Sequence, residues 1–130
     1  MPGCGQPSAD FAFTEVGYAV TGGVAGFDRS LRIDPDGSYR ATDANRPERS
    51  GRLTGAQLRE LKRLLGEVDW AGLRFSYVDG RVVDSLHQSL TVRTEQVEHQ
   101  TTVGTGGEPP PEVAALLAFL DSLLREALSP

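Results

Sequence analysis

Apolar and polar residues alternate in several short stretches of the chain, whereas in two longer stretches the apolar residues recur every three to four positions. Alternation is typical of a half-buried strand, and the longer period is typical of an amphipathic helix. We therefore predict strands over residues 11–20, 27–33, 38–42, 86–93 and 96–103. We predict helices over residues 54–68 and 111–127.

The predicted strand over residues 11–20 changes phase part-way along. Phe11 and Phe13 occupy odd positions, whereas Val16, Tyr18 and Val20 occupy even ones. One uninterrupted strand would place these two sets on opposite faces of a sheet. A bulge near residues 14–15, or two short strands, would reconcile them.

The clearest hairpin turns at Asp34–Gly37, where a proline suits the first corner and the final glycine suits a left-handed residue. A three-residue loop pairs Ile33 with Tyr39 and Leu31 with Ala41, which places four apolar side chains on one face. A two-residue loop would pair the same apolar residues with polar ones. The pattern therefore predicts the longer loop.

A second hairpin joins residues 86–93 to residues 96–103 through residues 94–95. This two-residue loop sets Leu90 opposite His99 and Val92 opposite Val97. His87 then lies on the other face with the polar residues. Because the two histidines of the chain lie on opposite faces, they cannot share a zinc ion.

The first helix begins with a complete set of signals. Thr54 is a suitable N-cap, Gln57 completes a capping box, and Leu53 and Leu58 are spaced as a hydrophobic staple. We expect Trp70, which follows this helix, to fill the core beneath it. The buried stripe of the helix itself is predicted to be Leu58, Leu61, Leu65 and Val68, with Leu64 at the margin.

The second helix begins at the proline triplet of residues 109–111, a position that proline tolerates. Glu112 and Arg125 complement the helix dipole. Its apolar face is predicted to be Val113, Leu116, Leu117, Leu120, Leu124 and Ala127.

The order of elements predicts the fold class α+β, as a two-layer domain. We expect a mostly antiparallel sheet of four to six strands with two helices on one face. Residues 1–10 are predicted to be a disordered N-terminal segment, and residues 11–128 a single domain. Residues 43–52 are interpreted as a polar connection, and residues 71–85 as a loop or a short hairpin turning at Asp79-Gly80.

Composition and residue spacing argue against several classes of function. The 130 residues include 13 Lys and Arg against 18 Asp and Glu, a formal net charge of −5, which argues against nucleic-acid binding. No apolar run has the ~20 residues of a transmembrane helix. No serine, histidine or acidic cluster has the spacing of a nucleophile with its base or of a metal site. We therefore predict a protein that is not an enzyme and has no cofactor, catalytic residue or metal.

Cys4 is the only cysteine, so no disulfide forms within the chain. Its setting, with glycine on both sides and Pro7 after it, resembles the join between a lipoprotein signal and its tether. On that interpretation Cys4 is a lipidation site, and the protein is secreted or held in the cell envelope. The other interpretation is an exposed thiol in a frayed start, with a cytoplasmic location.

The stretch Gly22–Phe27 lies between two predicted strands and has three glycines in its first five positions. It lacks the lysine and the Ser or Thr of a phosphate loop, and a strand follows it where that motif needs a helix. Two interpretations remain for Gly22, Gly23, Val24, Ala25, Gly26 and Phe27. They form a compact turn, or a protruding loop that binds another protein.

This stretch and the order of elements around it resemble the emfourin family, small bacterial protein inhibitors of thermolysin-like metalloproteases. The chain differs in its extra residues before the first strand and in its long connection at residues 43–52. The likeness covers roughly residues 16–125 and rests on Thr21–Phe27, Arg29-Ser30, the leucines from Leu53 to Leu65, Asp84, Ser89–Val92 and Val113–Leu124.

The resemblance implies inhibition by occlusion, in which a convex loop enters the cleft of a zinc protease. Gly22–Phe27 is then the expected partner-binding segment, and Asp34–Gly37 is a second candidate. The alternative is a surface-tethered, lipoprotein-type binding or structural module of unknown ligand. A metalloprotease gene beside the native gene would favour the inhibitor. The sequence leaves the oligomeric state open.

Overall fold

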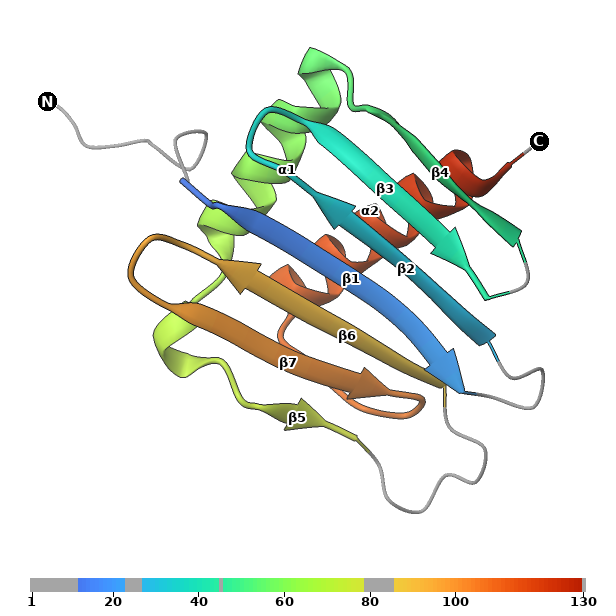
Figure 1. The fold of residues 1–130 in the computed structure, drawn as a ribbon. Coiled ribbons are helices and arrows are strands. Elements are labelled where there is room, and N and C mark those ends of the chain that lie inside the picture. Colours follow the sequence, from blue (N-terminus) through green and yellow to red (C-terminus); the bar gives the residue numbers. More distant parts are fainter. Residues whose placement is uncertain (1–11, 23–26, 45, 79–85, 130) are drawn as a thin grey trace, which may run out of the picture.

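The structure is a computed structural model that describes residues 12–22, 27–44, 46–78 and 86–129. A seven-stranded sheet has the order β4-β3-β2-β1-β6-β7-β5, and both helices cover the same face of it (Figure 1). The elements are β1 (Glu15–Gly22), β2 (Phe27–Ile33), β3 (Ser38–Asp43), β4 (Arg46–Arg52), α1 (Gly55–Glu67), a 3₁₀ turn (Trp70–Gly72), β5 (Ser76–Tyr77), β6 (Leu86–Arg93), β7 (Glu98–Gly104) and α2 (Pro111–Leu128).

The predicted two-layer α+β class is confirmed, but the sheet has seven strands where four to six were expected. The interpretation of residues 43–52 as a connection is wrong, because Arg46–Arg52 forms the edge strand β4. The other additional strand, β5, has two residues and pairs parallel with β7. Residues 79–85, where a hairpin turn was considered, lie outside the described residues.

The phase change before β1 has a simple cause. The strand begins at Glu15, so Val16, Tyr18 and Val20 face the helices in one unbroken alternation. Phe13 is also buried, but it precedes the strand. Residues 12–22 therefore contain neither the bulge nor the second strand that the sequence suggested.

The β2–β3 hairpin has the predicted register, in which Leu31 lies opposite Ala41 and Ile33 opposite Tyr39. Its loop closes through a hydrogen bond from the Gly37 amide to the Asp34 carbonyl. Gly37 has a φ of 93°, the left-handed conformation expected of the last loop residue.

The β6–β7 hairpin has a longer loop than predicted. Val92 lies opposite His99, and Leu90 lies opposite Thr101. The Thr94 amide donates to the Val97 carbonyl, so four residues turn the chain where two were expected. The predicted pairing was therefore wrong by two positions along β7. A shift of two positions keeps each side chain on its face, so His87 and His99 still lie on opposite faces.

The core lies between the sheet and the two helices. The predicted capping box is present at the start of α1, where the Gln57 amide donates to Thr54 Oγ1 and the Thr54 amide donates to Gln57 Oε1. Leu64, expected at the margin, is buried, whereas Leu58 is only partly so. The helices contribute the buried residues Leu61, Leu64, Leu65, Val113, Leu116, Leu117, Leu120, Leu123, Leu124 and Leu128.

Because both helices pack on one face, no helix in the described part of the chain covers the opposite face of the sheet (Figure 1). We call it the open face. Small and polar side chains occupy it, since β1 places Gly17 and Ala19 there, and β6 places Ser89 and Thr91 there. The fold therefore leaves two kinds of surface for function, the turns at the strand ends and the open face.

Candidate functional site

The predicted partner-binding segment Gly22–Phe27 connects β1 to β2. The two strands remain paired to their last residues, where Gly22 lies opposite Phe27. Gly22 has a φ of 89°, a conformation that glycine adopts far more easily than any residue with a side chain. Gly23, Val24, Ala25 and Gly26 lie outside the described residues.

The strands that support this segment belong to the middle of the sheet. β1 pairs with β6 along its whole length on one side, and with β2 from Val16 to Gly22 on the other. The chain therefore enters the segment from a strand held by two ladders of hydrogen bonds.

The second candidate, Asp34–Gly37, lies at the other end of β2. The two segments lie at opposite ends of β2, whose seven residues, Phe27–Ile33, span about 20 Å from the first to the last. The Asp36 carboxylate accepts hydrogen bonds from the hydroxyl and the amide of Ser38, which lower the pKa of Asp36. The Asp36 carboxylate therefore forms hydrogen bonds within its own turn, as aspartates in turns commonly do.

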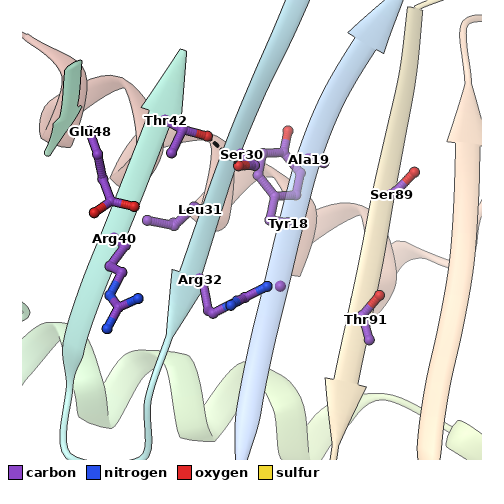
Figure 2. A pocket seen from close by; sticks show the side chains of 11 residues that line it. Tyr18, Ala19, Ser30, Leu31, Arg32, Arg40, Thr42, Glu48, Ser89 and Thr91 are labelled. Atoms are coloured by element: carbon purple, nitrogen blue, oxygen red, sulfur yellow. Dashed lines mark hydrogen bonds between the residues drawn. The ribbon is translucent and has the colours of Figure 1, made fainter. Parts of the chain in front are cut away.

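A hollow of about 310 Å³ lies on the open face, over β1, β2 and β3 (Figure 2). Arg32 extends from β2 across β1, while Arg40 projects from β3 and Glu48 from β4. Its floor and walls come from Gly17, Tyr18, Ala19, Ser30, Leu31, Arg32, Arg40, Thr42, Glu48, Ser89 and Thr91.

The hollow was not foreseen from the sequence. A sequence signal does exist, because Gly17, Ala19, Ser30 and Ser89 all occupy the polar phase of their strands. These positions become neighbours only once β1 is known to lie between β2 and β6. That order is a long-range property of the fold, and local alternation does not reveal it.

The histidines lie apart, as predicted. His99 lies on the helix side of the sheet and stacks on Trp70, with ring centroids 4.8 Å apart. Trp70 packs against the core but is only half buried, and its Nε1 donates to the Leu65 carbonyl at 3.1 Å. Within the described ranges, no group of three or more His, Cys, Asp or Glu residues could hold a metal ion.

One buried ionisable group lies beneath the open face. The Tyr18 hydroxyl donates to Asp121 Oδ1 of α2 at 3.0 Å and accepts from Gln88 Nε2 of β6 at 2.7 Å. Burial raises the pKa of Tyr18 well above its ordinary value, and the nearby Asp121 carboxylate adds to this. Arg125 lies 2.8 Å from Asp121, so the network joins α2 to two strands. The network therefore runs from the buried Tyr18 to the surface at Arg125.

The chain was also compared with known proteins. No family model matches it, and no curated protein is similar to it in sequence. The expected lipidation site, Cys4, lies outside the described residues. In the part of the chain that the structure describes, no helix is long and apolar enough to cross a membrane.

Proposed function

We propose that the protein inhibits a thermolysin-like metalloprotease by binding across its cleft and performs no chemistry itself. The segment Gly22–Phe27 is the part that enters the cleft. One structural observation carries this proposal: the segment joins two central strands that stay paired up to Gly22 and Phe27. The sequence resemblance described above supplies the class of target.

The anchoring of the segment supports inhibition by shape. Only four residues separate the last paired positions of β1 and β2, and a loop this short has a small closure entropy. A preorganised segment keeps more of its contact energy as affinity, because less is spent on ordering the chain.

The test is the inhibition of a thermolysin-like protease by matched variants. In Val24→Arg a charged side chain is placed in the proposed contact segment. In Val97→Arg the same change is made in the β6–β7 turn, at the opposite end of the sheet, where Val97 is already 49% exposed. Each protein is assayed with a peptide substrate, and its thermal unfolding is measured in parallel.

We expect Val24→Arg to raise the inhibition constant at least tenfold, because an unpaired charge must lose its hydration in the cleft. A tenfold change corresponds to about 1.4 kcal/mol. Val97→Arg is expected to inhibit like the original protein, and both variants to unfold at similar temperatures. If both variants lose inhibition equally, the contact segment is assigned wrongly.

A further inference from the structure

We propose that the open face binds a carboxylate carried by an acidic segment of a partner protein, with Arg40 as its principal contact. This inference deepens the proposed function, because it names the chemistry that the partner presents to a second surface. It rests on the proposed function only in requiring a protein partner.

The first observation is a pair of like charges. Arg32 on β2 and Arg40 on β3 lie directly opposite one another. Like charges at such positions repel and destabilise a sheet unless each is balanced. Arg32 is balanced, because its Nε lies 3.0 Å from the Glu15 carboxylate.

Arg40 has no such balance. Among the described residues, no carboxylate lies within 4 Å of the Arg40 guanidinium group. The residue opposite Arg40 on the neighbouring strand β4 is the uncharged Ser50. The side chain is exposed at the rim of the hollow (Figure 2). An arriving carboxylate would therefore relieve a repulsion and could form paired hydrogen bonds with the planar guanidinium.

The floor of the hollow admits such a group close to the sheet. Gly17 and Ala19 carry little or no side chain, and an added Cβ at Gly17 would come no nearer than 3.8 Å to Thr91. The Ser30 and Thr42 hydroxyls bond to each other at 2.5 Å. The Thr91 hydroxyl has no hydrogen-bond partner among the described residues, so it is available as a donor.

The charge of the hollow favours a carboxylate over a phosphate. With Arg32 balanced by Glu15, Arg40 is the remaining cation, and Glu48 lies on the same rim. Glu48 repels any anion, but it repels a doubly charged phosphate more strongly than a singly charged carboxylate, so a single negative charge matches this arrangement better.

The shape of the hollow favours a protein over a small molecule. Small-molecule sites enclose most of the ligand surface, whereas this hollow is open on a sheet face. Arginine is enriched at protein–protein interfaces, where it forms well-oriented contacts with acidic groups. Because the chain carries a net charge of −5, binding to an acidic segment has to come from this local arrangement.

The test is an NMR titration of the labelled protein with the blocked peptide acetyl-Gly-Glu-Gly-Glu-Gly-amide. The matched probe replaces both glutamates by glutamine, and inorganic phosphate is a third arm. The proteins compared are the original chain, Arg40→Gln and the control Arg46→Gln. Arg46 lies on the exposed strand β4 and does not line the hollow.

We expect the acidic peptide to shift the amide signals of Ser30, Thr42 and Thr91. Its affinity should be at least fivefold weaker for Arg40→Gln and unchanged for Arg46→Gln. The glutamine peptide should bind at least fivefold more weakly, and phosphate should leave the three signals in place. The inference fails if the two peptides bind equally, if both variants bind like the original chain, or if phosphate binds more tightly than the peptide. No protease is involved, so this result is independent of the inhibition assay.

Discussion

Two glycines with nearly the same backbone conformation allow the role of the β1–β2 segment to be separated from its effect on folding. Gly22 has a φ of 89° and Gly37 has a φ of 93°. Alanine in the left-handed region costs about 1–2 kcal/mol. Reduced freedom of the unfolded chain returns about 0.4–1 kcal/mol of this. Each Gly→Ala variant should therefore lose on the order of 1 kcal/mol of unfolding free energy.

The surroundings of Gly37 add little to that cost. A Cβ there would meet the Leu58 Cδ2 atom at 3.5 Å and the Leu53 Cβ atom at 3.8 Å, which are ordinary contacts. Gly37→Ala thus matches the backbone strain of Gly22→Ala at the opposite end of β2, and because Gly37 belongs to the second candidate segment, the pair also decides between the two segments. For a chain of this length, 1 kcal/mol corresponds to a fall of about 3–6 °C in Tm.

The assay combines urea or thermal unfolding with inhibition of a thermolysin-like protease. We expect both variants to lose similar stability, but only Gly22→Ala to raise the inhibition constant, by about tenfold or more. The reason is that Gly22 sets the direction in which the chain leaves β1. Equal loss of inhibition in both variants would refute this reasoning, as would full inhibition by a destabilised Gly22→Ala protein.

Two further predictions concern stability. The pKa of Tyr18 is raised in the folded state. Its contribution to the free energy of unfolding is therefore complete below pH 10, where the unfolded tyrosine also keeps its proton, and this contribution is lost as the pH rises further. The free energy of unfolding should fall by up to about 1.4 kcal/mol on going to pH 11. Tyr18→Phe should remove this pH-dependent loss of stability. At neutral pH it should lower the free energy of unfolding by about 1–2 kcal/mol, since the hydroxyl bonds to Asp121 and Gln88. Urea unfolding at several pH values measures both effects. Thr54→Ala removes the N-cap of α1 and should lower the free energy of unfolding by about 1 kcal/mol. The urea midpoint should fall while the slope stays unchanged. An unchanged midpoint would show that this cap does not stabilise the protein.

Some parts of the fold follow from local chemistry and were therefore predictable. The β2–β3 register follows from the alternation of Leu31 and Ile33 together with one glycine able to adopt a positive φ. The start of α1 follows from a capping box whose two hydrogen bonds are both present. In each case, neighbouring residues contain all the information that decides the geometry.

The β6–β7 register was not determined in the same way. Apolar alternation assigns side chains to faces, and a shift of two positions leaves every assignment intact. The deciding contacts lie in the loop, where Thr94 Oγ1 accepts hydrogen bonds from the amides of Gln96 and Val97. Val97 therefore belongs to the turn and is exposed, although its apolar character suggested a place opposite Val92.

Edge strands were the main omission. Every residue of β4 is exposed, so Arg46–Arg52 has no apolar phase by which a strand could be recognised. Its charges and its proline are typical of an edge that avoids pairing with other chains. The strand exists because β3 offers it a row of backbone partners. The hollow was missed for a related reason, since it depends on the long-range pairing of β1 with β6.

We propose above that this protein acts on a protease by occupying its cleft. The most direct measurement is a titration of a thermolysin-like metalloprotease with the purified chain, at an enzyme concentration well above the inhibition constant. We expect protease activity to fall linearly and to be abolished near one equivalent of the chain, while the chain remains uncleaved. Full activity at a tenfold molar excess, across several proteases of this class, would contradict it.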